Sequence, residues 1–240
     1  AAHMTLPRLA VSNAGRNSAR STMTIGLIAT ASFLIVAMSS FRLDPTMEGA
    51  GGFSFVGESS LPIFPDLNTP EGREEAIPND SKVLDGATIL SLRVQPGDDA
   101  SCNNLFKSQR PRVLGVTPEM LKHFDQENVT GFSWAKTAAK TEAERKNPWR
   151  LLDRVEEDAV PVIVDQNTAM FGLGIYAVGG EASYDYEGST LKVRVVGFLQ
   201  NSLLQGSLMI SDANFRRHFT NVDGYRFFLV KPPHVESNQA

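Results

Sequence analysis

The chain has 240 residues, of which 42% are hydrophobic and 21% are charged, a balance that suffices for one sizeable domain or two small ones. Its net charge of −4 argues against nucleic acid as a partner. The one cysteine, Cys102, excludes an internal disulfide framework and a cysteine-rich zinc site.

The first residues carry an unbalanced positive charge. Residues 1–3 with Met4 are interpreted as a cloning remnant and are left out of the fold prediction. Arg8, Arg16 and Arg20 follow, and no acidic residue precedes Asp44. Residues 1–22 are therefore predicted to be a tag remnant and a basic segment.

Residues 23–41 form an uncharged, predominantly apolar run. As a helix this run covers about 28 Å, close to the hydrocarbon thickness of a bilayer. A buried core helix would carry a polar face, a cleaved signal peptide would start nearer the N-terminus, and a pilin-type start would carry a glutamate. We therefore predict a transmembrane helix. Because the upstream charges are basic, the N-terminus is predicted to be cytoplasmic and the bulk of the chain extracytoplasmic.

After a glycine-rich linker at residues 42–52, strand and helix patterns alternate irregularly. Residues 51–64 suggest a short strand ended by Pro62 and Pro65, and residues 66–82 an exposed excursion. Further strands are predicted at 87–97, 160–165, 188–200, 207–210 and 225–230.

The predicted helices of the outer domain are short. Residues 113–124 are predicted to run from strand to helix, with Thr117 as N-cap. The other helices are predicted at 134–147, stopped by Pro148, and at 167–174 and 211–219. This order predicts a mixed α+β domain rather than a doubly wound sheet.

Two short motifs suggest chemistry but lack its context. Ser133 with Lys136 and Ser189 with Lys192 both match S-x-x-K, yet the second pair lies in a predicted strand and the companion K-T-G is absent. Residues 172–180 are glycine-rich, but they follow a predicted helix and are interpreted as a turn.

No nucleotide or metalloprotease motif is present. His123 and His218 have no Asp or Cys at ligand spacing. The acidic residues 156–158 are interpreted as a solvated face, and residues 98–99 as part of a turn. We therefore predict no catalytic, cofactor-binding or metal-binding residues, no cofactor, and no enzyme activity.

The sequence resembles FtsX/MacB-like ABC-transporter permeases over most of its length. The basic motif Arg-Asn-Ser-Ala-Arg-Ser at 16–21, followed by the apolar run, is similar to the first transmembrane segment of that family. The stretches VLGVTPEML, VPVIVDQNTAMFGLG and VRVVGFLQNSLLQGSLMISDANFRRHF resemble elements of its periplasmic core domain.

This resemblance implies a permease subunit of the export or lipoprotein-release type, whose outer domain transmits or gates ATP-driven movement. The implied partners are a separate cytoplasmic ATP-binding subunit, membrane lipid and a second permease subunit, and the implied location is the cell inner membrane. The alternative is a single-pass anchored receptor or secretion-machinery component with a partner-binding outer domain. The expected parts are the basic segment 1–22, the transmembrane helix 23–41, the linker 42–52, the extracytoplasmic domain 53–231 and a polar tail 232–240 at which the expressed fragment ends.

Overall fold

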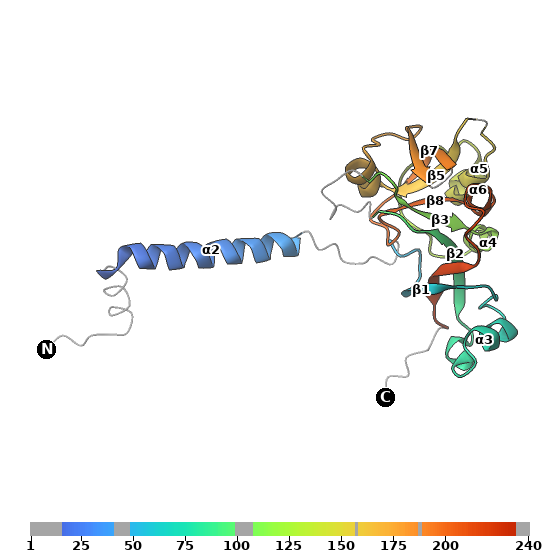
Figure 1. Ribbon diagram of the computed structural model, residues 1–240, viewed down its shortest axis with the longest axis horizontal. Helices are drawn as coiled ribbons and strands as arrows, with labels where there is room; N and C mark the ends of the chain where they lie inside the picture. The colour runs from blue at the N-terminus through green and yellow to red at the C-terminus, as the bar shows by residue number, and fades with distance from the viewer. Residues whose placement is uncertain (1–15, 41–48, 99–107, 157, 187–188, 234–240) are drawn as a thin grey trace. The chain divides into compact units, whose positions relative to one another are not determined.

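The computed structural model describes residues 16–40, 49–98, 108–156, 158–186 and 189–233. The predicted tag remnant and most of the predicted linker and polar tail lie outside these ranges. The chain divides into two compact units, Ala1–Asp44 and Pro45–Ala240 (Figure 1).

The first unit contains α2 (Ser18–Ser40), which begins before the predicted start at residue 23. By length and composition, Ser18–Met38 could cross a membrane. The hydroxyls of Thr24 and Thr30 donate to the carbonyls of Arg20 and Gly26, at 2.9 and 2.8 Å, so both are satisfied within the helix. None of the large apolar side chains from residue 23 to residue 38 is buried by the described part of the chain, unlike those of a core helix.

The second unit is built on one mixed sheet. The described residues give the strand order β1-β9-β2-β3-β8-β5-β7-β4, with β6 paired to β7. The β3–β8 and β5–β7 pairs are parallel, and the other pairs are antiparallel. The strands are β1 (Phe55–Ile63), β2 (Thr88–Gln95), β3 (Arg112–Val116), β4 (Trp134–Thr137), β5 (Val160–Asp165), β6 (Glu181–Tyr186), β7 (Ser189–Leu199), β8 (Ser207–Ser211) and β9 (Tyr225–Lys231).

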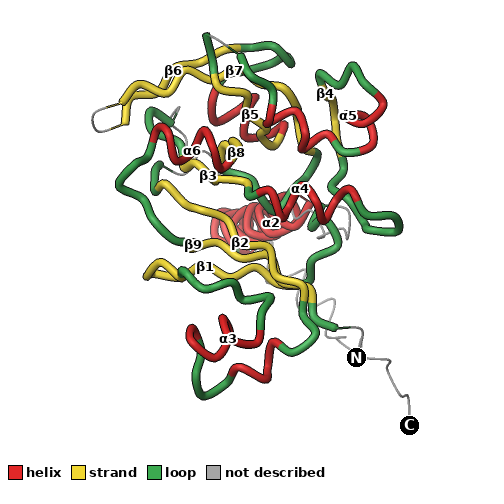
Figure 2. Tube along the Cα trace, turned by 90° about the vertical axis from the view of Figure 1, so that its right-hand side faces the viewer, coloured by secondary structure: helices red, strands yellow, loops and turns green. Residues whose placement is uncertain are grey.

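Short helices cover both faces of the sheet, which confirms the predicted α+β class. On one face, α4 (Pro118–Asp125) and the 3-10 helix η2 (Pro148–Asp153) bury Met120, Phe124 and Trp149 in one cluster with side chains of β2, β3, β5, β7 and β8. On the other face lie the π-helix η3 (Thr168–Leu173) and α6 (Asp212–His218). Helices α3 (Pro70–Ala76) and η1 (Ser81–Leu84) lie beside β1, at the far end of the sheet from β6 and β7 (Figure 2).

Several predicted elements are confirmed because local signals and tertiary packing agree. The segment at 113–124 runs from β3 into α4 with Thr117 at the N-cap position. Residues 160–165 form the buried strand β5. Alternation along β7 buries Leu191, Val193 and Val195. Ser211 caps α6, and Phe215 and Phe219 pack in one cluster on its buried side.

The first strand ends close to the predicted place, between Pro62 and Pro65. β1 continues through Pro62 to Ile63, with a register irregularity after Glu58. Proline cannot donate a hydrogen bond to a sheet, but it is tolerated in an edge strand or at a bulge. β1 is such an edge strand, since among the described residues it pairs with β9 alone.

The excursion predicted at 66–82 is in fact partly buried. Thr69 accepts a hydrogen bond from the amide of Gly72 at 3.1 Å and so begins α3. Arg73, 7% exposed, donates to the carbonyl of Leu67 and to Asp85. Leu67 packs with Ile89 and Phe228 in a third, small core. The segment was predicted to be exposed because it is polar and contains prolines, and its sequence does not indicate these long-range contacts.

The helix predicted at 134–147 is also wrong in its first half. Trp134 lies 5.4 Å from Trp149, ring to ring, and residues Trp134–Thr137 pair with β7 as strand β4. Helix α5 (Glu142–Lys146) begins only at Thr141, which forms a capping box with Glu144. Tertiary pairing therefore overrides helix propensity at the start of this segment. Strand β6 was not predicted at all.

Candidate functional site

The chain enters the second unit through an ordered segment, residues 49–54, which we call the entry segment. Its backbone is fixed at several points: the amide of Leu203 donates to the carbonyl of Gly49 at 3.0 Å, and that of Ser54 to the carbonyl of Val230 at 3.1 Å. Gly51 and Gly52 have positive φ angles of 60° and 80°. A Cβ at Gly51 would lie 2.3 Å from the ring of Phe132, so only glycine fits there.

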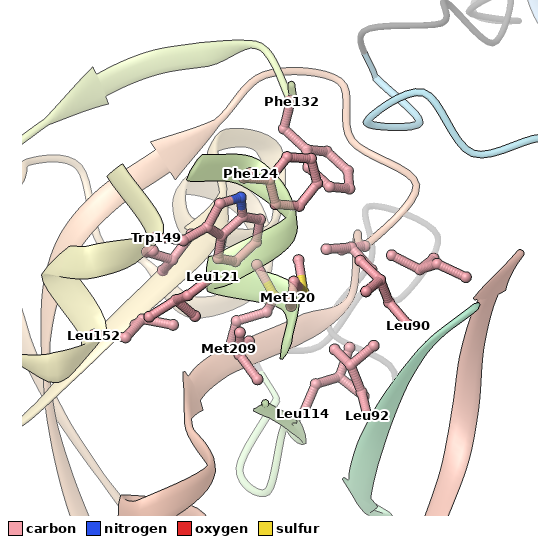
Figure 3. Packing of buried hydrophobic residues seen from close by; sticks show 14 of the residues in the cluster. Leu90, Leu92, Leu114, Met120, Leu121, Phe124, Phe132, Trp149, Leu152 and Met209 are labelled. Atoms are coloured by element: carbon pink, nitrogen blue, oxygen red, sulfur yellow. The ribbon is translucent and has the colours of Figure 1, made fainter. Parts of the chain in front are cut away.

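The side chain of Phe53 anchors the entry segment in the main core. The ring is 3% exposed and lies 6.4 Å from the ring of Phe124 and 5.4 Å from that of His123. Phe124 is followed by Phe132 and Trp149, with ring separations of 5.5 to 6.2 Å (Figure 3). Such an aromatic chain is rigid, because close-packed rings cannot shift independently.

The last strand of the sheet, β9, ends next to the entry segment. Phe55 of β1 is opposite Val230 of β9, and Lys231 is opposite Thr88 of β2. We call the entry segment, His123 and residues 230–233 the junction. A displacement of the chain at Gly49 would thus be carried both into the core and into two neighbouring strands.

One titratable side chain belongs to the junction. Burial lowers the pKa of His123 below its ordinary value of 6.5, and the charge of Lys231 lowers it further. The imidazole is therefore neutral at pH 7. It lies against Phe53 and Phe124 and acts as a packing group.

Polar ties hold the remaining elements together. Arg93 of β2 donates to Asp212 of α6 at 2.8 Å, with the two side chains 9% and 10% exposed, and also to the carbonyl of Gly224. Asp165 is fully buried, and its carboxylate accepts from the amides of Asn167 and Ser202. Burial raises the pKa of Asp165, yet these bonds give it a role in shaping loops rather than in catalysis.

The structure separates the residues that suggested enzyme chemistry. Ser133 directly precedes β4, and Lys136 is exposed within it, so the pair lacks the helical turn that a Ser-Lys mechanism needs. Ser189 and Lys192 both lie in β7. His123 and His218 belong to helices on opposite faces of the sheet. The described residues contain no group of His, Cys, Asp and Glu that could hold a metal ion.

Other predicted features have simpler roles. Asp98 accepts from the amides of Gln109 and Arg110, 11 and 12 residues further along the chain, so its side chain joins two segments instead of closing the predicted turn. Glu156 pairs with Arg194, so the predicted solvated face is wrong at this residue. Gly174 ends η3 with a φ of 71°, which confirms the predicted turn. Cys102, Asp99 and Glu157 lie outside the described residues.

Edge strand β1, together with Phe64 just after it, carries exposed large apolar side chains. Phe55, Leu61 and Phe64 are 62%, 73% and 64% exposed. We call these three residues the edge patch. Exposed apolar side chains on an edge strand are typical of an interaction surface.

Comparison with solved structures gives several similarities, including the following two. No protein-family model and no curated protein matches the sequence. The periplasmic region of MacB from Actinobacillus actinomycetemcomitans is similar at 12% identity and a TM-score of 0.38, with 80% of each chain covered. The extracellular domain of the noncanonic ABC-type transporter YknZ from Gram-positive bacteria is similar at 11% identity and a TM-score of 0.33, with 74% of this chain and 83% of that chain covered.

Sequence reasoning missed the junction. The pair Gly51-Gly52 before Phe53 was visible, and two glycines before an aromatic residue could have indicated a tight, packed turn. Nothing local could have revealed that Phe53 meets His123, or that β1 pairs with a strand near the other end of the chain.

Proposed function

We propose that the chain is part of a membrane-spanning permease subunit of an ABC transporter of the export or lipoprotein-release type. In this proposal residues 23–41 cross the cell inner membrane, with a cytoplasmic N-terminus and an extracytoplasmic second unit. The outer unit transmits or gates movements that ATP hydrolysis drives. It does no chemistry of its own, and it needs neither a cofactor nor a catalytic residue.

The observation that supports this role best is the junction. Residues 41–48 join α2 covalently to an entry segment whose backbone is bonded at Gly49 and Ser54 and whose Phe53 is buried. An outer unit that senses or gates movement needs a rigid connection to the membrane helix. A flexible connection would let the helix move without displacing the sheet. The arginines at positions 8, 16 and 20 support the cytoplasmic placement of the N-terminus.

The proposal requires partners. These 240 residues contain no nucleotide-binding motif, so in this proposal a separate cytoplasmic ATP-binding subunit, or another part of the same protein, supplies the energy. Membrane lipid would surround the apolar helix, and a second permease subunit would complete the complex.

The test uses the full-length protein in lipid with its ATP-binding subunit. We expect the two to co-purify and to hydrolyse ATP in a vanadate-sensitive manner. Insertion of Gly-Ser-Gly-Ser after Glu48 adds slack before the junction, and should abolish transport while ATP hydrolysis continues. The same insertion after Thr220, an exposed turn residue outside the junction, is the control. Unchanged transport with the first insertion would contradict a coupling role.

The edge patch favours a second candidate, an anchored receptor or secretion-machinery component. Here Phe55, Leu61 and Phe64 would bind a partner protein on the outer side of the membrane. Absence of any associated ATP-binding subunit, together with loss of partner binding in a Leu61→Asp variant, would favour this candidate over the permease.

A further inference from the structure

A hollow of about 230 Å³ adjoins the edge patch. Phe64, which belongs to the edge patch, lines it together with Asp66 from the loop that follows β1. The N-terminal end of α4 contributes Thr117 and Glu119, and Asn68 with strands β2 and β9 completes the lining. Every residue of this lining lies in a described range.

The charged side chains of the lining are both acidic. Asp66 and Glu119 are exposed, and the lining contains no lysine, arginine or histidine. Arg93 lies over the ring of Tyr225, 4.9 Å from its centroid, but its charge is already compensated by Asp212 at 2.8 Å. The hollow therefore favours a positively charged group.

A hydroxyl of the lining is free to bind a ligand. The sequence Thr-Pro-Glu begins both α3, at Thr69, and α4, at Thr117. The hydroxyl of Thr69 accepts from the amide of Gly72 at 3.1 Å, whereas that of Thr117 has no hydrogen-bond partner among the described residues. Thr117 is 3% exposed, and its hydroxyl is not sealed from solvent. Because a nearly buried hydroxyl without a partner is costly, this group is available to a ligand.

A primary ammonium matches these groups. It has three donors, and the carboxylates of Asp66 and Glu119 and the hydroxyl of Thr117 can accept them. Oδ1 of Asp66 already accepts from the amide of Asn68 at 2.9 Å, so the other carboxylate oxygen is the available one. The exposed ring of Phe64 matches the hydrocarbon stem of a lysine. The N-terminal dipole of α4 opposes a cation, which predicts modest affinity.

The surface around the hollow indicates that the ammonium belongs to a protein. Leu61 and Phe64 are 73% and 64% exposed, and a small free amine would leave them uncovered. A second copy of this chain is disfavoured at this edge, because residues 53–66 contain Glu58 and Asp66 and no basic residue. The same acids disfavour an anionic lipid surface.

We propose that the hollow and the edge patch together bind an extended segment of a partner protein, which carries a lysine with an apolar side chain two residues away. In an extended segment such residues lie on one face, about 7 Å apart, so the lysine can enter the hollow while its neighbour covers Leu61 or Phe64. The inference rests on the partner-binding role proposed for the edge patch and names the chemistry of that partner. It does not depend on ATP-driven movement.

The test is fluorescence anisotropy of a labelled peptide with the full chain in phosphatidylcholine nanodiscs. The probe Ser-Leu-Thr-Lys-Thr-Leu-Ser reads the same in both directions, so the result does not depend on the direction of the bound segment. Acetylation of the lysine removes the charge and keeps the stem, and should weaken binding about tenfold or more. Replacement of both leucines by serine should also weaken binding. Empty nanodiscs measure partition into lipid.

Variants of the hollow locate the binding. Asp66→Asn keeps an acceptor for Asn68 but loses the charge, and with Glu119→Gln it should weaken binding about fivefold or more in each case. Thr117→Val should weaken binding without lowering the thermal midpoint, because the hydroxyl it removes is unpartnered. The matched control is Glu71→Gln, at the same place in the other Thr-Pro-Glu sequence and outside the lining, which should bind as the parent does.

Several outcomes would overturn the inference. Equal binding of the lysine and acetyl-lysine peptides would mean that the hollow does not recognise the charge, and would leave the edge patch as a purely apolar surface. Equal binding of the serine-substituted peptide would indicate a site for any amine. Lysine-dependent binding that survives both Asp66→Asn and Glu119→Gln would place it elsewhere. Absence of binding, or equal signal from empty nanodiscs, would also refute it, while the transport test of the permease would stand unaffected.

Discussion

For the buried ion pair between Arg93 and Asp212, we predict that removing the aspartate destabilises the fold more than removing the arginine. Asp212→Asn preserves volume but leaves a guanidinium that is 9% exposed without its counter-charge. The remaining partners of Arg93 are the Gly224 carbonyl at 3.2 Å and the ring of Tyr225 at 4.9 Å, and neither is charged. Removing one member of a buried pair costs about 3–5 kcal/mol, and we expect Asp212→Asn to fall in that range.

The reverse change should cost less. In Arg93→Met the carboxylate of Asp212 keeps Arg216, whose Nε lies 2.8 Å away and whose side chain is 60% exposed. Asp212 also lies in the first turn of α6, where the helix dipole stabilises a negative charge. We expect a loss of about 1–3 kcal/mol. The double variant should lose less than the sum of the two, because the pair is removed as a unit.

Urea unfolding followed by tryptophan fluorescence measures these differences, since Trp134 and Trp149 lie in the core region. The control is Lys192→Met, at an exposed ion pair with Glu181, which should cost no more than about 1 kcal/mol. A loss for Asp212→Asn no larger than that of the control, or an equal loss for the two single variants, would refute the reasoning.

Three further predictions follow from the same structure. Phe215 is fully buried against Gly115, so Phe215→Ala should reduce the free energy of unfolding by about 3–5 kcal/mol, whereas Phe171→Ala, at a residue 68% exposed, should change it little. The folded-state pKa of His123 lies below 6.5, so the unfolded chain binds a proton at this imidazole more readily than the folded chain does. The free energy of unfolding should therefore fall as the pH drops below about 6.5, and it should fall less steeply in His123→Gln. The pKa of His218 is also lowered, so His218 adds a pH dependence of the same sign. An enzyme reporter active only outside the cytoplasm should be active when fused after Pro233, and activity of a cytoplasmic reporter there instead would reverse the proposed orientation.

Much of the fold could be predicted where local chemistry and tertiary packing point the same way. The segment from β3 through Thr117 into α4 has a capping residue, a proline at the first helical position and an apolar face. Strand β7 alternates and strand β5 is continuously apolar, as their burial requires. These patterns need no knowledge of a partner strand.

The errors share one physical cause. Trp134–Thr137 has helix-forming neighbours but is held as a strand by β7 and by the ring of Trp149. Residues 66–82 are polar, yet Arg73 is buried because Leu67 and Asp85 meet its donors. In both places long-range contacts outweigh local preference, and sequence spacing does not encode them.

The sequence by itself determined that this chain has a long apolar helix with basic residues before it, because length and charge act without tertiary context. It also determined the α+β class of the second unit from the mixture of periodicities. Only the tertiary structure decided which segments meet. It brought β1 beside β9 and set the ring of His123 against Phe53 and within the field of Lys231, because each of these contacts joins residues that lie far apart along the chain.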